Sequence, residues 1–232
     1  MKDRILKNGY LLFACGFALG ILSFLLIHTA IPLDVTCDDW IIRGYVERDI
    51  IQHYTGWLFY RDSSTPFPLG IADGMGFPHG ASIAFSDSIP LFAIIFKPFS
   101  KILPETFQYF GIYNLICYGL SGGVAALICR LFSKNPFSVL AFSTVISINP
   151  VMIERSFRHT SLASQFLILS ALYLYLLSKR GVRKWHFYPL LLVLSVTIHF
   201  YFVPMVFLIM SADIIDDAVK NKGWLKKLGF LL

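Results

Sequence analysis

Long apolar runs separated by short polar clusters set the pattern of this chain. A helix needs roughly 20 apolar residues to cross the hydrocarbon core of a bilayer, and several runs approach or exceed that length. The pattern therefore predicts an all-α, polytopic bundle of about six transmembrane helices. The expected spans lie at about 10–31, 105–131, 136–153, 160–178, 187–199 and 201–215.

Residues 88–103 form an apolar segment that does not fit this series. Lys97, Pro98 and Lys101 interrupt it, so its uninterrupted apolar part is short. Such a segment is more typical of an interfacial or re-entrant helix than of a span. The first run is longer than the apolar core of a secretory signal, which predicts an uncleaved first span.

The basic residues support this layout. Of the 20 lysines and arginines, 13 fall in four short clusters at 2–7, 130–134, 179–184 and 220–227. Cytoplasmic loops carry an excess of Lys and Arg. The bias fits six spans with a cytoplasmic amino terminus, provided that residues 88–103 do not cross. The charge bias thus predicts a multi-pass membrane protein whose amino terminus is cytoplasmic.

The long polar segment 32–104 becomes the first extracytoplasmic loop, with juxtamembrane amphipathic helices inside it. Eight of the 14 acidic residues lie there. We treat 1–232 as one transmembrane module. Because the closing KKLGFLL resembles the opening of a further span, we expect this module to be the amino-terminal portion of a longer protein.

Composition narrows the class of partner. The chain is 56% hydrophobic and 15% charged, whereas a soluble domain carries roughly 25% charge. The net charge of +6 comes from short clusters between apolar runs, not from a stripe that would follow phosphates. We therefore expect a lipid bilayer and no nucleic acid as a partner. The four cysteines contain no CxxC pair, so neither a disulfide framework nor a metal knuckle is expected.

The segment that begins at Asp49 has a helical period and carries candidate chemistry. One side is apolar, and the opposite side gathers Asp49, Gln52, His53 and Gly56. On a helix that lies along the membrane surface, Asp49 and His53 would share the solvated face. An aspartate four residues before a histidine can orient it, or can itself accept a proton. The alternative is an ordinary surface helix with a polar face.

Further carboxylates lie in the same loop. Asp38 and Asp39 are adjacent, so chelation by both requires a turn, and helix capping is the alternative. Asp87 either caps the next short helix or faces Asp49 across a cleft. If a divalent cation such as Mg or Mn is used, its candidate ligands are Asp38, Asp39, Asp49 and Asp87. The glycine-rich stretch 70–80 lacks the GK[ST] ending of a nucleotide loop, and we interpret it as a flexible turn.

The stretch ERSFRHTS, residues 154–161, places two arginines and a histidine at the outer end of a span. The planar fork of arginine suits a phosphate, so Arg155, Arg158 and His159 are candidate phosphate ligands. Snorkelling of interfacial arginines is the alternative. His199 lies between two apolar runs and either caps a helix hairpin or marks a functional position.

Four motifs resemble those of an uncharacterised bacterial membrane-protein family that is similar to the polytopic GT-C glycosyltransferases. They are D-x-x-Q-H-Y-x-G-W-x-F-Y-R from Asp49 to Arg61, F-P-L-G at 67–70, F-S-D-S-I-P-L at 85–91 and L-P-E-T-F-Q-Y-F-G at 103–111. The order of a first span, a long outer loop with an early acid, and a second helix begun by an acid and a proline resembles the same superfamily. The resemblance covers most of the chain.

The resemblance implies roles for particular residues. Asp49 takes the position of the catalytic base, and Asp87 that of a second acid. In aminoarabinose-type transferases a lysine follows that acid and helps to hold the donor phosphate, but Ser88 and Ile89 stand here. Arg155, Arg158 and Lys97 are the candidate replacements.

The expected activity is transfer of a sugar from a polyprenyl-phosphate donor to a glycan or lipid acceptor on the extracytoplasmic face. Asp49 would act as base in an inverting reaction, and His53 would orient it or contact the acceptor. The alternative is a non-catalytic carrier or flippase for a lipid-linked envelope intermediate. Transport would call for polar groups deep within spans, whereas the charges here gather at the ends of spans, which favours surface chemistry.

Overall fold

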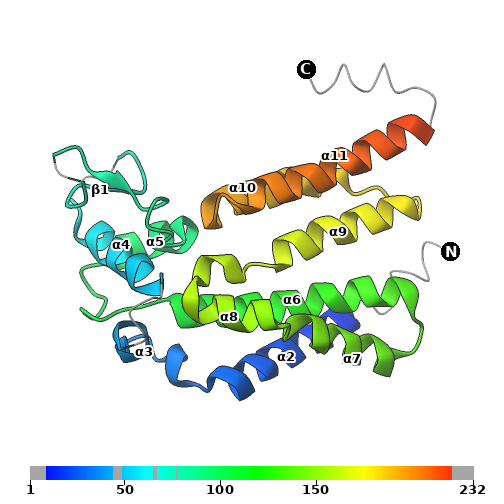
Figure 1. The fold of residues 1–232 in the computed structure, drawn as a ribbon, viewed down its shortest axis with the longest axis horizontal. Coiled ribbons are helices and arrows are strands. Elements are labelled where there is room, and N and C mark those ends of the chain that lie inside the picture. Colours follow the sequence, from blue (N-terminus) through cyan, green and yellow to red (C-terminus); the bar gives the residue numbers. More distant parts are fainter. Residues whose placement is uncertain (1–8, 44–48, 65–66, 77, 221–232) are drawn as a thin grey trace.

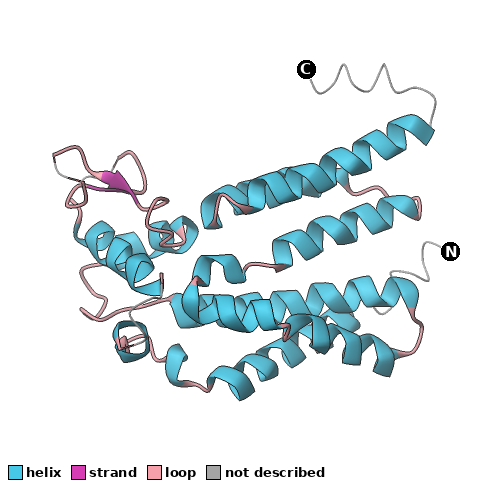
Figure 2. Ribbon diagram, in the orientation of Figure 1, coloured by secondary structure: helices cyan, strands magenta, loops and turns pink. Residues whose placement is uncertain are grey.

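The computed structural model describes residues 9–43, 49–64, 67–76 and 78–220. Long helices lie side by side in one bundle, and short helices with a small hairpin form a cap at one end (Figure 1). Helix dominates the described residues (Figure 2). The helices are α2 (Gly9–His28), α3 (Asp39–Ile42), α4 (Ile50–Asp62), α5 (Pro90–Phe96), α6 (Phe110–Phe132), α7 (Pro136–Ser147), α8 (Pro150–Arg158), α9 (Phe166–Lys179), α10 (Tyr188–Ile198) and α11 (Phe202–Lys220). The strands are β1 (Ile71–Ala72) and β2 (Ala81–Ser82), and 3-10 turns occur at Ile31–Leu33, Lys97–Phe99, Thr160–Ala163 and Trp185–Phe187.

Three helical segments of the described chain are long and apolar enough to cross a membrane: Gly9–His28, Phe110–Phe132 and Thr160–Lys179. A fourth results if α7 and α8, which are bent by 41° at a short break, form one span. The prediction of a mostly helical membrane protein is confirmed at this level. The expected spans at 187–199 and 201–215 are not in this set, because the helix Trp185–Ile198 is shorter and α11 carries Asp213, Asp216 and Asp217. Residues Pro90–Phe99 form a short apolar helix, in line with a segment that does not cross.

The contact between α2 and α6 depends on glycines. A Cβ on Gly20 would lie 2.2 Å from the carbonyl oxygen of Tyr118, and one on Gly16 would lie 2.5 Å from that of Gly122. The two backbones therefore touch, which is the usual way in which small residues allow transmembrane helices to pack.

The break between α7 and α8 has a local cause. Asn149 caps α8, because its Oδ1 accepts a hydrogen bond from the backbone N–H of Met152 at 3.0 Å, and Pro150 takes the first helical position. The predicted continuous run 136–153 is therefore two helices. The new helix carries Arg155 and ends at Arg158, just before His159, near the cap.

A cationic side chain holds two segments of the cap together. Arg61 at the end of α4 donates to the backbone carbonyls of Ser100, Leu103, Pro104 and Glu105 at 2.8–3.2 Å. The glycine-rich stretch 70–80, expected to be a flexible turn, contains β1 and ends just before β2, and the two strands pair antiparallel with Ile71 opposite Ser82.

Candidate functional site

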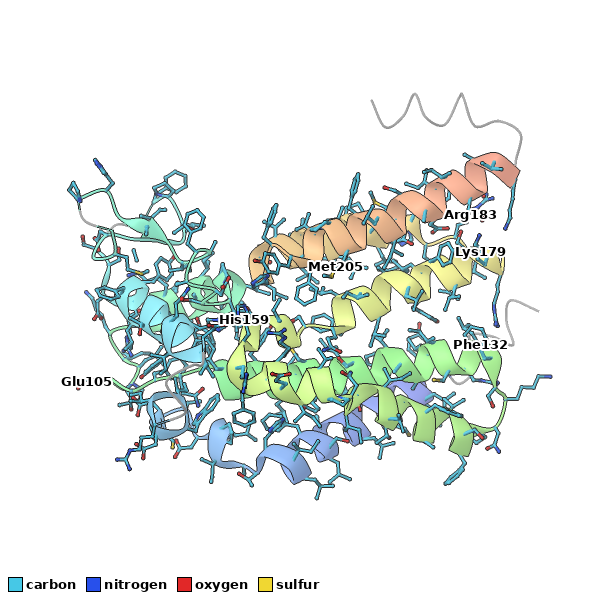
Figure 3. All side chains as sticks on the ribbon, viewed as in Figure 1. Glu105, Phe132, His159, Lys179, Arg183 and Met205 are labelled. Atoms are coloured by element: carbon cyan, nitrogen blue, oxygen red, sulfur yellow. The ribbon has the colours of Figure 1, made fainter. Side chains whose placement is uncertain are left out.

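Five ionisable side chains meet where the bundle joins the cap. We call them the His–Asp cluster; they are Asp49, His53, Asp87, His159 and His199. Asp49 immediately precedes α4, and His53 lies in its first turns. Asp87 comes from the loop before α5, while His159 follows α8 and His199 follows α10. Figure 3 labels His159 at this junction.

His159 is the centre of the cluster. Its Nδ1 lies 2.8 Å from Asp49 Oδ2. Its Nε2 lies 3.3 Å from His199 Nε2 and 3.6 Å from Asp87 Oδ2. The other carboxylate oxygen of Asp87 lies 3.1 Å from His199 Nε2. One imidazole therefore connects two carboxylates and a second imidazole.

Bonds to α6 hold the chain around His159 in place. Asn114 Nδ2 donates to the carbonyl oxygen of Ser156 at 2.7 Å. The hydroxyl of Tyr113 donates to the carbonyl oxygen of Ser161 at 2.9 Å. These buried contacts bracket His159 on both sides and attach it to a helix long enough to span the membrane.

The hydrogen bonds assign the protonation of both central histidines. An ionised carboxylate only accepts hydrogen bonds, so Nδ1 of His159 carries the proton that Asp49 accepts. In this tautomer of the neutral ring, Nε2 of His159 presents a lone pair. In His199, Nδ1 accepts from the backbone N–H of Tyr201 at 3.1 Å, so its proton is on Nε2, where Asp87 Oδ1 at 3.1 Å and His159 Nε2 at 3.3 Å are its acceptors.

His53 is fully buried, and neither of its ring nitrogens has a hydrogen-bond partner among the described residues. Its ring lies 4.7 Å from that of His159 in an edge-on arrangement. Burial lowers the pKa of His53 to about 3, and the nearby His159 contributes to the shift, so the ring is neutral. The expectation that His53 and Gly56 lie on a solvated face is wrong, because α4 packs against the 83–89 loop and α6 rather than lying open on a membrane surface.

Asp87 is held in an uncommon backbone conformation. Its φ is +53° and that of Ile89 is +52°, which costs of order 1–3 kcal/mol for residues with side chains. Ser88 Oγ donates to the carbonyl oxygen of His53 at 2.7 Å, and the Tyr109 hydroxyl donates to the carbonyl oxygen of Ser88. These bonds fix the turn. Asp87 does not cap α5, because Ile89 is the N-cap residue.

The charge of Asp87 is also set by its surroundings. Burial by itself would raise the pKa of Asp87, but the hydrogen bond from His199 and the neighbouring imidazoles hold it below its ordinary value. The carboxylate is therefore ionised. The side chain of Asp49 is 58% exposed and makes no capping bond to α4. It remains open to solvent and to a substrate.

An apolar cleft of about 460 Å³ approaches the cluster from the side of the bundle. Arg155 is its charged lining residue and lies one helical turn before His159. Phe202 belongs to the lining, and its ring lies 6.4 Å from that of His199. The other lining residues are Ile146, Asn149, Val151, Leu162, Gln165, Ile168, Leu169 and Met205, the last of which is labelled in Figure 3.

The remaining candidate phosphate ligands are engaged elsewhere. Arg158 is exposed and pairs with Glu154 at 3.5 Å. Lys97 donates to the backbone carbonyls of Tyr60, Arg61 and Ser63 at the end of α4. Lys97 therefore stabilises the end of α4 within the cap, and its expected role at a donor phosphate is not supported.

The adjacent aspartates do not join the cluster either. Asp38 accepts a hydrogen bond from the Tyr54 hydroxyl at 3.2 Å, and Asp39 pairs with Arg43 at 3.0 Å. The expected metal site built from Asp38, Asp39, Asp49 and Asp87 is therefore not assembled. Instead, His53, Asp87 and His159 each offer an atom for a metal ion, and these atoms lie within 4.8 Å of one another.

The sequence pointed to His199 without assigning it a role in the site. Its signal was an imidazole at the end of an apolar run, where an ionisable side chain is costly without partners. Nothing in the local pattern indicated that its partner would be Asp87, which lies more than 100 residues earlier in the chain.

Comparison with known proteins gives a family but no activity. No curated protein matches the chain, and no solved structure does. A family model described as a domain of unknown function, DUF6311, matches residues 17–232. The chain therefore belongs to the DUF6311 family.

Proposed function

We propose that this protein is a membrane glycosyltransferase that moves a sugar from a polyprenyl-phosphate donor to a glycan or lipid acceptor at the cap end of the bundle. One observation carries the proposal. The half-exposed carboxylate of Asp49 is hydrogen-bonded to His159 at 2.8 Å. His159 lies one helical turn after Arg155, which lines an apolar cleft.

The chemistry assigns one task to each group. Asp49 takes the proton of an acceptor hydroxyl as its oxygen attacks the anomeric carbon. The bond between that carbon and the phosphate oxygen breaks, and polyprenyl phosphate leaves with the electron pair from the opposite face, which inverts the configuration. His159 orients Asp49 through its Nδ1 proton.

The apolar cleft is the proposed binding site for the polyprenyl chain of the donor. Its volume is within the range of roughly 300–1,000 Å³ that small-molecule sites occupy, and apolar side chains dominate its lining. Arg155 is positioned to bind the phosphate, since its guanidinium can donate two hydrogen bonds to one anionic group. Among the three expected cations it is the one that pairs with no carboxylate or backbone carbonyl of the described residues, whereas Arg158 and Lys97 do.

The distribution of charge supports an orientation with the cap outside the cell. Lys179 and Arg183 lie at the end of the bundle opposite His159 (Figure 3), and Arg130 lies in the last turn of α6. Under the positive-inside rule that end faces the cytoplasm. The proposal includes a GT-C-like, six-span arrangement in the bacterial inner membrane, a cytoplasmic amino terminus and residues 32–104 as the first external loop. A membrane-impermeant thiol reagent should label His79→Cys, but not Lys134→Cys, in intact cells of a cysteine-free variant.

The activity can be tested with full-length protein in proteoliposomes. A panel of polyprenyl-phosphate sugars is supplied with bacterial membrane lipids as acceptors, and released polyprenyl phosphate is measured by mass spectrometry. Loss of the base should lower the rate about 10²–10⁴-fold in Asp49→Asn, whereas Asp39→Asn, an exposed carboxylate outside the cluster, should react normally. Full transfer by Asp49→Asn rejects the assignment. Movement of the lipid-linked sugar across the bilayer, without its cleavage and equal in both variants, would identify a carrier or flippase instead.

A further inference from the structure

We propose that the His–Asp cluster binds a divalent transition metal ion of the zinc type through His53, Asp87 and His159. The inference rests on the geometry of the described residues and goes beyond sugar transfer. The ligands expected from sequence were carboxylates for Mg or Mn, whereas imidazole nitrogen suits zinc and the other later first-row metals.

Acceptor atoms of His159 and Asp87 converge on one place in the cluster. Nε2 of His159 presents a lone pair, and Asp87 Oδ2 faces it at 3.6 Å. Two acceptors at that distance repel each other unless a cation or proton lies between them. The one proton on His199 Nε2 lies between the other oxygen of Asp87, at 3.1 Å, and His159 Nε2, at 3.3 Å, so it does not relieve this contact fully.

His53 provides the second, independent observation. It is a fully buried imidazole with both ring nitrogens unpartnered, and leaving such a group unsatisfied costs roughly 1–3 kcal/mol. An imidazole without hydrogen-bond partners can turn a ring nitrogen lone pair toward an ion. One of its nitrogens lies within 4.8 Å of the ligand atoms of Asp87 and His159, so a bound metal would satisfy it.

The spacing suits one ion. Ligand atoms bound to a single zinc at about 2.0–2.2 Å lie roughly 3.2–3.6 Å apart in a tetrahedron. The His159–Asp87 pair already has this separation. The 4.8 Å limit for the whole set requires only a small closing movement of side chains.

The surrounding hydrogen bonds have the pattern of a metal site. Metal-bound histidines usually donate their other N–H to a carboxylate or carbonyl, as His159 does to Asp49 at 2.8 Å. His199 Nε2 donates to Asp87 and would orient that ligand. His199 is not itself assigned as a ligand, because its Nδ1 accepts a hydrogen bond and its Nε2 carries the proton.

Two histidines and one carboxylate leave at least one coordination position for water or for an anionic oxygen of a substrate. The ion would also fix the ring of His159 and, through it, the carboxylate of Asp49. The two carboxylates of the cluster match the double charge of the ion.

The test uses full-length protein without a histidine tag, stripped with a chelator and then dialysed against Zn²⁺. Metal content by mass spectrometry should be one zinc per chain in the wild type. His53→Asn and His159→Asn should each lose it, whereas His79→Asn, an exposed hairpin histidine, should retain it. His199→Asn should still bind but with about 10–100-fold lower affinity, as expected for an outer partner of a ligand.

Co²⁺ replaces Zn²⁺ in a second measurement that does not depend on the folding of a variant. The wild type should show the intense visible bands of a low-symmetry nitrogen and oxygen site. Less than about 0.2 zinc per chain in the wild type overturns the proposal, and so does equal zinc in wild type and in the His53→Asn, His159→Asn double variant. Neither result depends on sugar transfer, so failure here is distinguishable from failure of the proposed function.

Discussion

Asp49 and His159 are separated by 110 residues in the chain, yet their side chains meet at 2.8 Å. The first precedes the helix of the cap that contains His53, and the second ends a helix of the bundle. Their hydrogen bond is therefore a direct connection between the two parts of the molecule, and it fixes the direction of the half-exposed carboxylate.

This pair should behave as one unit in sugar transfer. Asp49→Asn and His159→Gln are each expected to lower the rate of polyprenyl phosphate release, and the double variant should be no slower than Asp49→Asn alone, since the histidine acts through the carboxylate. Rates are measured in proteoliposomes. Asp39→Asn combined with Asp49→Asn serves as the control, and the effects of these two substitutions on the rate should be independent. If the double variant is slowed by the product of the two single effects, Asp49 and His159 do not act as one unit.

Gly56 permits the close approach of α4 to the turn that carries Asp87. A Cβ at this position would lie 2.0 Å from Ser86 Oγ and 2.3 Å from Ser88 Oγ. Gly56→Ala should therefore destabilise the protein by about 1–3 kcal/mol and displace Asp87. The measurement is thermal unfolding in detergent together with zinc content. Gly9→Ala is the matched control, because within the described part of the chain its Cβ would meet only Leu127 Cδ2, at 3.7 Å; it should be neutral or slightly stabilising. Equal unfolding midpoints for the two variants would be inconsistent with this packing.

Arg61 holds the chain between the short helix α5 and α6. Its guanidinium donates to four backbone carbonyls, and it is 9% exposed. Lysine lacks the planar fork, so Arg61→Lys should leave some of these carbonyls unsatisfied and cost about 2–4 kcal/mol of unfolding free energy. Chemical denaturation in detergent measures the loss. Arg43→Lys changes an exposed ion pair and should shift stability by less than about 0.5 kcal/mol; a similar loss in both variants would refute the special role of Arg61.

The buried imidazole of His53 makes the metal-free protein sensitive to acid. Its pKa is lowered to about 3 in the folded state, whereas an unfolded histidine has a pKa of about 6.5. Between these values the unfolded state binds more protons, so stability falls as the pH drops below 6.5. By pH 4.5 the loss from this group is roughly 3 kcal/mol.

Unfolding midpoints of chelator-treated protein between pH 7.5 and 4.5 test this expectation. His53→Asn should flatten the curve, because asparagine does not titrate. His79→Asn should leave the curve unchanged. If wild type and His53→Asn lose stability in parallel, another group is responsible.

The sequence predicted the helices more readily than their contacts. Apolar runs located α2, α6 and α9 to within a few residues, because such runs have few alternatives in a membrane protein. The break at Asn149-Pro150 was missed within the run 136–153, although a residue before proline favours an extended backbone. For α10 and α11 the runs were recognised, but their length and acidic residues set them apart from the clear spans.

The site was predicted in part. Asp49, Asp87 and His159 were identified from their positions in the polar segments, and the structure brings all three together. What the pattern could not supply was which polar residues become enclosed. The period of α4 placed His53 with Gln52 on a wet face, but burial was decided by a loop and a helix that lie far away in sequence. Lys97 was likewise assigned by charge, while the structure uses it to bind the carbonyls at the end of α4.

The wide spacing of the cluster along the chain has a consequence for biosynthesis. Asp49, His53 and Asp87 leave the ribosome first, and the cap must wait for α8 and α10 to deliver His159 and His199. Until then the carboxylate of Asp87 lacks its contacts with both imidazoles, and the ring of His53 lacks its contact with His159. The His–Asp cluster is therefore complete only after the later helices have been made, and a chain stalled before α10 lacks part of it.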